Sequence, residues 1–307
     1  FMSNPLLPTS LHFFERGWLS PNNILLVDDS CAVLIDTGYH THAEQTLELV
    51  RNTLGQQPLS HIFNTHLHSD HCGGNSYLQA AFPNISTHVP PGHAAQVHQW
   101  NPWALSYTPT GQNCPRFVLN DVLHSGTHFE IADTKWEIHS APGHDPHAIL
   151  IFCPALGILI SADALWENGF GVVFPEIEGV NAFQEVADTL DLIESLQPRI
   201  VLPGHGSAFT DVDAALARAR SKLSYFVKSP EKHAIYAAKV LLKFKLLELQ
   251  QTELTSFFKW AESAEYLKIL HSEYAKATEF EAWILSLCES MSHSGTCQIE
   301  ANIIFNR

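Results

Sequence analysis

The sequence lacks a basic surplus and a long apolar run. Lys and Arg number 17 against 32 Asp and Glu, which gives a formal net charge of −15. Proteins that bind nucleic acid by neutralising phosphates usually carry a cationic surplus, so the composition argues against a nucleic-acid partner. No apolar run approaches the ~20 residues of a transmembrane helix, and we therefore expect no membrane span.

Paired cysteines are lacking too. The six cysteines are scattered through the chain, and none belongs to a CxxC motif. Disulfide frameworks are typical of secreted proteins and rare in reducing compartments. The N-terminal stretch FMSNPLLPTSLHFFERG shows neither the basic start nor the apolar core of a secretory signal. These features predict reduced thiols and a cytoplasmic protein.

What the chain does have is an apolar fraction of 45% over 307 residues, which is typical of a well-packed globular protein. The first two thirds alternate short apolar runs with stretches of helical periodicity. The expected elements, in chain order, are a hairpin (22–29 and 31–38), a helix (41–55), a strand (59–66), a helix (73–83), two strand pairs (127–144 and 148–163), a helix (181–197) and a strand (199–206). Strand pairs followed by a helix, repeated twice, predict two mixed sheets covered by helices, an αβ/βα sandwich.

The C-terminal third has a different, mostly helical pattern. We expect a boundary near residue 219, between a first domain (1–219) and a helical cap domain (220–307). Three helices and a closing hairpin over 295–307 fit either a winged-helix shape or a plain helical cap. Lysines become frequent from Lys222 to Lys245, as on a solvated helix surface or an anion-binding face.

Two stretches, 98–116 and 165–179, mix aromatic residues with Pro and Gly. Aromatic side chains on long connections form either the apolar wall of a ligand pocket or the cover of a core edge. The sequence leaves both alternatives open.

The stretch FNTHLHSDHCGGN, residues 63–75, places four potential metal ligands within six positions: His66, His68, Asp70 and His71. Two histidines two residues apart at a strand end project to the same side of the chain. Asp70 and His71 follow where the chain turns into a helix, so they point to a second location nearby.

Three later turns each offer one further ligand at the end of an expected strand. They are His144 in SAPGHDPH, Asp163 in LISADAL and His205 in VLPGHG. Five imidazoles and two carboxylates suffice for two divalent metal ions, with zinc as the default and iron or manganese as alternatives. A carboxylate such as Asp163 can bridge two ions at a separation of roughly 3.5–4 Å.

Together these motifs resemble those of the metallo-β-lactamase-fold hydrolases. The strand-end LIDTG around Asp36 matches that superfamily as well, and the likeness extends over about residues 20–210. The resemblance implies that His66, His68 and His144 bind one metal and that Asp70, His71 and His205 bind the other. Asp163 would bridge the two ions. An Asp at this position makes the ligand set similar to that of the glyoxalase II, lactonase and thioesterase branch.

A water between two divalent ions has its pKa lowered towards neutrality. We therefore expect a hydrolase in which a metal-bound hydroxide attacks the carbonyl carbon of a small acyl substrate, namely an ester, thioester or lactone. Asp70 is the candidate catalytic residue, because it is the nearest carboxylate able to orient or receive the proton. Two alternatives stay open, a metallo-nuclease and a regulatory or ligand-binding protein with little turnover.

Overall fold

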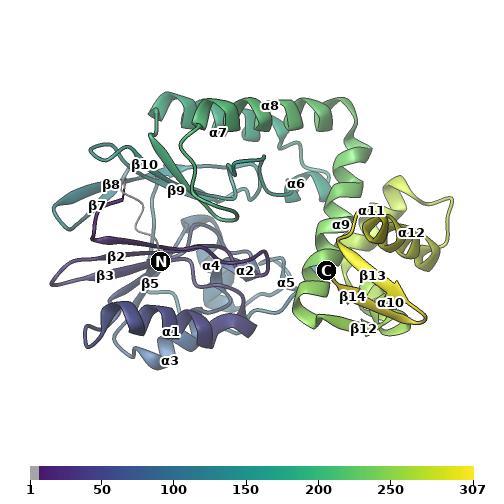
Figure 1. Cartoon of the computed structure of the whole chain (residues 1–307), viewed down its shortest axis with the longest axis horizontal. Coiled ribbons are helices and arrows are strands. Elements are labelled where there is room, and N and C mark those ends of the chain that lie inside the picture. The colour runs from purple at the N-terminus through teal and green to yellow at the C-terminus, as the bar shows by residue number, and fades with distance from the viewer. Residues whose placement is uncertain (1–6) are drawn as a thin grey trace.

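Two β-sheets face each other, and helices cover the outer side of each (Figure 1). The structure, a computed structural model, describes residues 7–307. Residues 1–6, where the stretch inspected for a secretory signal begins, lie outside them. The first sheet has the order β1-β2-β3-β4-β5-β6, with β1 (Leu11–Phe14), β2 (Asn23–Val27), β3 (Ala32–Ile35), β4 (His61–Phe63), β5 (Ser86–Val89) and β6 (Asp121–Val122). The second has the order β11-β10-β9-β8-β7, with β7 (His128–Ile131), β8 (Thr134–Ser140), β9 (Ile149–Cys153), β10 (Ile158–Ala162) and β11 (Ile200–Pro203).

Both sheets are mixed. In the first, β3 pairs antiparallel with β2 and parallel with β4. In the second, β10 pairs antiparallel with β9 and parallel with β11. A parallel pair needs a crossover connection, and α1 (Ala43–Leu54) and α7 (Phe183–Leu196) provide one for each sheet. The predicted αβ/βα sandwich is therefore confirmed.

Alternation along the strands builds three apolar layers. In β3, Val33 and Ile35 point into the cluster between the two sheets, whereas Leu34 points into the cluster beneath α1. In β10, Ile160 joins the central cluster and Leu159 packs beneath α7. Successive side chains of a strand point to opposite faces, so a continuous apolar run fits a strand that is buried on both sides.

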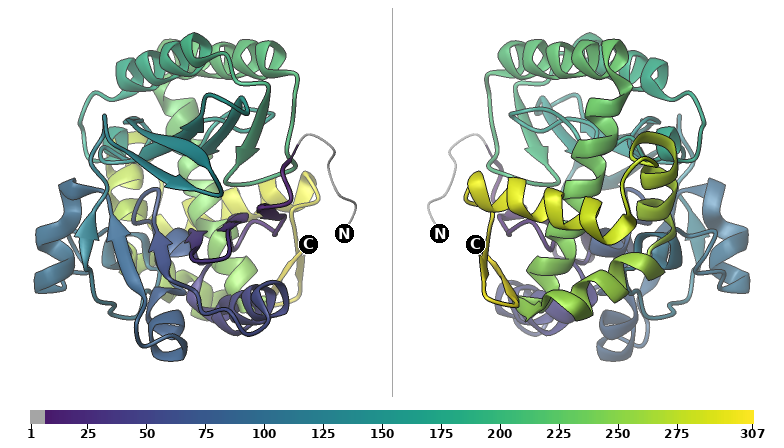
Figure 2. Two further views of the ribbon diagram at one scale, coloured as in Figure 1. Left: turned by 90° about the vertical axis from the view of Figure 1, so that its left-hand side faces the viewer. Right: turned by 90° about the vertical axis from the view of Figure 1, so that its right-hand side faces the viewer.

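Shorter helices connect the strands, and longer ones form the C-terminal third. The remaining helical elements are η1 (His40–His42), α2 (Ser69–Cys72), α3 (Asn75–Ala81), η2 (Pro91–His93), α4 (Ala94–Gln99), α5 (Tyr107–Thr110), α6 (Phe174–Ile177), α8 (Val212–Lys228), α9 (Pro230–Leu249), α10 (Leu254–Ser263), α11 (Glu265–Tyr274) and α12 (Phe280–His293). Helix α8 lies beside α7 on the outer face of the second sheet, and α9 then runs across one end of the sandwich (Figures 1 and 2). None of the helices within residues 7–307 has both the length and the apolar character needed to cross a bilayer.

The closing hairpin expected over 295–307 is confirmed as β13 (Cys297–Glu300) and β14 (Ile303–Asn306). A third strand, β12 (Gln251–Glu253), pairs with β14 and was not predicted. The boundary expected near residue 219 falls inside α8, where Ala219 is buried in the cluster shared with α7. The division into two domains stays a prediction.

The central cluster supports the ends of the strands that carry the candidate ligands. Leu202 of β11 is fully buried there, three residues before His205. Truncating such a side chain loses its transfer free energy and leaves a cavity, so we expect Leu202→Ala to lower the free energy of unfolding by about 2–5 kcal/mol. Urea titration measures this loss. Val180→Ala, at a 55% exposed position, is the control, and an equal effect in both variants would contradict the account.

Candidate metal centre

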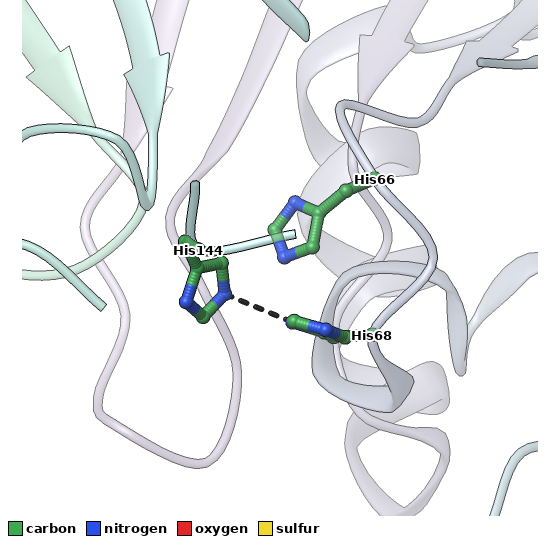
Figure 3. A group of neighbouring side chains, drawn as sticks. All are labelled: His66, His68 and His144. Carbon is green, nitrogen blue, oxygen red and sulfur yellow. Dashed lines mark hydrogen bonds between the residues drawn. The ribbon is translucent and has the colours of Figure 1, made fainter. Parts of the chain in front are cut away.

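All seven predicted ligands converge at one end of the sandwich. They form two groups, and within each group one nitrogen or oxygen atom per residue lies within 4.8 Å of the others. The first group consists of His66, His68 and His144, whose rings point toward one another in Figure 3. The second group consists of Asp70, His71, Asp163 and His205.

Each ligand follows a strand of one of the two sheets. His66 and His68 lie in the loop after β4, and Asp70 and His71 lie on the single-turn helix α2. The other three follow β8, β10 and β11 of the second sheet: His144, Asp163 and His205. The site therefore exists only where the edges of the two sheets meet.

Glycines allow the neighbouring loops to approach the ligands closely. A Cβ atom at Gly204 would collide with Oδ1 of Asp163, and one at Gly171 would collide with the His144 ring. Only a residue without a side chain fits at such contacts.

Asp163 lies between the two groups. Its Oδ2 is 3.4 Å from Nε2 of His144 in the first group. The same oxygen is 3.4 Å from Nε2 of His71 and 3.7 Å from Nε2 of His205 in the second group. One carboxylate oxygen thus faces imidazole nitrogens of both groups, which is the position that a bridging ligand requires.

The ring nitrogens that point away from the centre have partners. Metal-binding histidines typically donate their second N–H to a carboxylate, a carbonyl or another acceptor, which leaves the inner nitrogen unprotonated. The outer contacts are His66 Nδ1 with Thr65 Oγ1 at 3.0 Å, His68 Nε2 with Asp145 Oδ2 at 3.5 Å, His71 Nδ1 with Asp36 Oδ2 at 2.7 Å, His144 Nδ1 with the Val172 carbonyl at 2.5 Å, and His205 Nδ1 with the Gly17 carbonyl at 3.4 Å.

The inner nitrogens of His66 and His71 are buried without a hydrogen-bond partner among residues 7–307. A buried polar atom with no partner costs free energy. Lone pairs of imidazole nitrogens next to carboxylate oxygens are the donor set that zinc and similar ions accept. The residues therefore fit a pair of divalent cations.

The electrostatics favour positive charge at this centre. Burial, and then the neighbouring His71, lower the pKa of His66 well below its ordinary value. His71 behaves in the opposite way. Burial lowers its pKa, but Asp70, Asp163 and Asp36 outweigh burial and raise the pKa well above the ordinary value. The carboxylates hold positive charge at the position where a dication would supply it.

Asp36 anchors the loop that carries the first ligands, as the LIDTG motif suggested. Its carboxylate accepts hydrogen bonds from the Thr65 backbone N–H at 2.9 Å and the Thr65 hydroxyl at 2.7 Å, as well as from His71. The backbone of Asp36 has a φ of 59°, a left-handed conformation that is uncommon for residues other than glycine and that clusters at functional sites.

A cavity of about 160 Å³ opens onto this centre. Its polar floor includes His68, Asp70, His144, Asp163 and His205, and its apolar wall includes Trp18, Trp166, Phe174, Tyr236 and Phe244. Of the two aromatic stretches, 165–179 supplies Trp166 and Phe174 to the wall. In 98–116, Trp100 and Tyr107 instead pack in a core cluster beneath the metal loop.

Sequence reasoning missed Trp18, Tyr236 and Phe244. Trp18 lies on a loop before β2, and the other two lie on α9. The helical periodicity of α9 indicated an apolar stripe but not what that stripe faces. Only the packing of α9 across the end of the sandwich brings these side chains to the site.

The lysines that become frequent after Arg218 do not form one basic face. Lys228 and Lys232 are exposed, as on a solvated helix surface. Lys222 is enclosed by aromatic rings, with its ammonium 4.2 Å from the Tyr236 ring centroid and 3.1 Å from the Phe170 carbonyl, and burial lowers its pKa to about 8. Lys245 forms an ion pair with Glu248 at 2.9 Å.

His233 of α9 makes a hydrogen bond to the segment that forms part of the cavity wall. Its Nε2 accepts a 3.0 Å hydrogen bond from the backbone N–H of Val173, which lies between the wall residues Val172 and Phe174. Burial, and then the nearby charge of Lys222, lower the pKa of His233 to about 4. The ring is therefore neutral at pH 7 and acts as an acceptor.

This neutral histidine makes stability depend on pH. Between about pH 6.5 and pH 4 the unfolded chain protonates at this position and the folded chain does not, so acidification through this window destabilises the fold by on the order of 3 kcal/mol. We expect His233→Gln, whose side-chain oxygen can still accept the Val173 hydrogen bond, to remove this loss. Urea titrations at both pH values measure it. His124→Gln, at an exposed position, should keep the wild-type slope, and the same slope in both variants would refute the role of His233.

Asp36 permits a direct test of the second ligand group. In Asp36→Asn an amide N–H₂ can face Nδ1 of His71, which moves the ring proton to the inner nitrogen. Loss of such an outer partner typically lowers metal affinity by about 10–100-fold. We therefore expect the affinity of the protein for one of the two ions to fall to this extent. Competition with a chromophoric chelator measures the affinity. Asp133→Asn, an exposed residue that also has a positive φ, is the matched control, and unchanged affinity in Asp36→Asn would show that the contact is dispensable.

Comparison with known proteins agrees with this geometry. The chain is 33% identical over 149 residues to the hydroxyacylglutathione hydrolase of Rhodobacter capsulatus, covering 48% of each chain. It is 26% identical over 168 residues to the enzyme of the same name from Haemophilus ducreyi, covering 54% of this chain and 58% of the relative. The chain therefore matches about half the length of these curated relatives.

A solved structure supports the fold over nearly the whole chain. A metallo-beta-lactamase family protein from Thermus thermophilus superposes with a TM-score of 0.58 at 18% identity, covering 98% of this chain and 100% of that one. The family model of the metallo-beta-lactamase superfamily matches residues 16–205, a range that contains all seven candidate ligands. The chain belongs to the metallo-beta-lactamase superfamily.

Proposed function

We propose that this protein is a dinuclear metal-dependent hydrolase that cleaves a small acyl substrate, namely an ester, thioester or lactone. The observation that carries the proposal is the position of Asp163. Its Oδ2 alone lies 3.4–3.7 Å from imidazole nitrogens of both ligand groups, and the residue lies on the floor of a cavity with an apolar wall. The name hydroxyacylglutathione hydrolase of the matched relatives supports an acyl substrate.

In this proposal His66, His68 and His144 hold one ion, and Asp70, His71 and His205 hold the other, with Asp163 shared. Zinc is the default for this donor set, and iron and manganese accept the same residues. Divalent ions at these positions would lower the pKa of a water molecule and polarise a carbonyl oxygen.

The residues of the chain supply orientation and exclude solvent. Asp70 is the most exposed of the four buried carboxylates at this centre, with 13% of its side chain accessible against 6% for Asp163, 5% for Asp145 and 4% for Asp36. Asp70 is a candidate ligand on the cavity floor and the more exposed of the two carboxylates there, and we assign to it the role of orienting the attacking water and receiving its proton. The aromatic wall excludes bulk water, which strengthens each polar interaction on the cavity floor.

No structural observation favours the nuclease. Lys222, Lys243 and Lys245 of α8 and α9 have partners within the protein, and the net charge is −15. A regulatory protein with little turnover differs from a hydrolase in its kinetics rather than in the geometry of its site.

A panel of substrates with metal-loaded protein tests the proposal. It comprises an acyl-glutathione, an acyl-CoA, an acyl-homoserine lactone, a cephalosporin and a single-stranded RNA. We expect turnover of one acyl class, and we expect His66→Ala to lower kcat/KM by at least about 100-fold. Mutation of an outer partner of a metal ligand already lowers metal affinity or activity by about 10–100-fold, and His66 is a candidate ligand itself. His124→Ala, outside the cluster, should retain the activity. If no substrate of the panel is turned over although two ions are bound per chain, the hydrolase proposal is overturned and the regulatory protein is favoured. Cleavage of RNA alone would favour the nuclease.

A further inference from the structure

A second, larger hollow adjoins the cavity of about 160 Å³ that opens onto the candidate metal centre. It measures about 340 Å³ and shares Trp18, Tyr236, Val240 and Phe244 with the cavity. Its other lining residues are Lys239, Lys243, Leu247, Met291, Ser294 and Thr296. We call this hollow the outer groove. Because the two spaces have walls in common, a ligand that occupies one can extend into the other.

Helix α9 lines both spaces. Tyr236, Val240, Phe244 and Leu247 recur at intervals of four, four and three residues, which places them on one helix face. From Tyr236 to Leu247 this stripe extends for about 16 Å at 1.5 Å per residue. The first three residues line both spaces, and Leu247 lines only the outer groove. The stripe is thus a continuous apolar track that leads away from the candidate metal centre.

Trp18 stands where the two spaces meet. It is 54% exposed, although its ring stacks on His205 with centroids 5.0 Å apart and contacts the edge of Trp166 at 5.2 Å. One side of the indole therefore packs on a candidate metal ligand while the rest faces open space. A large aromatic ring held in this way is a ready surface for an apolar ligand.

The outer groove also carries a positive charge. Lys239 donates a 2.7 Å hydrogen bond to the Ser290 hydroxyl and takes part in no ion pair among residues 7–307. Lys245, on the same helix, is by contrast paired with Glu248. In a chain of net charge −15, an unpaired ammonium beside an apolar track fits a ligand that is apolar with an anionic substituent.

We propose that the outer groove binds an apolar chain attached to the reacting carbonyl group, and that Lys239 pairs with an anionic group on that chain. The identity of the reacting group rests on the proposed hydrolase function, whereas the occupancy of the groove does not. The chain belongs either to the acyl group or to the leaving group, and the kinetic experiment below distinguishes the two.

The first experiment needs no turnover. The probe is 8-anilinonaphthalene-1-sulfonate, which combines aromatic rings with one anionic group and fluoresces when it is bound in an apolar site. We expect Leu247→Trp, which fills the outer groove, to weaken binding by at least about fivefold. Lys239→Gln should weaken it by about threefold, as expected for a partly exposed ion pair.

Two matched controls lie on the same helix and outside the groove. Leu249→Trp changes a 40% exposed leucine, and Lys232→Gln changes an exposed lysine. Both should bind the probe as the wild type does. Equal binding by Leu247→Trp and Leu249→Trp would overturn the proposal, as would the absence of probe binding to the folded wild-type protein.

The second experiment uses neutral N-acetylcysteamine thioesters with acetyl, hexanoyl and decanoyl groups, and acetyl thioesters of hexanethiol and decanethiol. We expect kcat/KM to rise about threefold per added methylene in one of the two series, and to rise further when that chain ends in a carboxylate. Leu247→Trp should abolish the rise, and Leu249→Trp should retain it.

The two proposals can fail separately. Hydrolysis that is independent of chain length in both series would overturn the groove assignment and leave the hydrolase standing. Probe binding that responds to Leu247→Trp, together with no hydrolysis of any thioester, would overturn the hydrolase on this substrate class and leave the groove standing.

Discussion

The structure depends on one electrostatic constraint, the burial of four carboxylates, those of Asp36, Asp70, Asp145 and Asp163, beside five imidazoles. Each of the four is at most 9% exposed, and the nearby inner nitrogens of His66 and His71 lack partners among residues 7–307. Buried charge without compensation costs several kcal/mol per ion, so positive charge has to reside among these groups. Three of these carboxylates raise the pKa of His71 against the effect of burial, and a pair of dications would meet the same demand more fully.

This constraint links the site to the packing of the whole sandwich. Two sheets contribute candidate ligands, the first through β4 and α2 and the second through the turns after β8, β10 and β11. The apolar cluster between the sheets fixes the positions of the strands that precede these turns. Helix α9 contributes aromatic side chains to the wall of the cavity above the candidate metal centre. Because the ligands assemble only when the sheets meet, metal binding and folding are expected to be thermodynamically linked.

Local patterns were sufficient to predict most strands and the residues that form the two groups of candidate ligands. Each ligand lies in a short motif at a strand end, and continuous apolar runs such as that of β10 indicated strands buried on both faces. Strands β1, β5, β6 and β12 were not predicted. Each has four residues or fewer, and β5, β6 and β12 pair with strands that are distant in the sequence. Trp18 and Tyr236 were missed for the same reason, since their role arises from long-range packing that no local spacing encodes.

The central claim is that the seven residues hold two metal ions with Asp163 shared between them. Crystals of zinc-loaded protein, with data collected on both sides of the zinc absorption edge, test it directly. We expect two anomalous peaks per chain, with Asp163 in contact with both. One peak should lie within bonding distance of His66, His68 and His144, and the other within bonding distance of Asp70, His71 and His205. A single peak, or two peaks that Asp163 does not join, would contradict this claim.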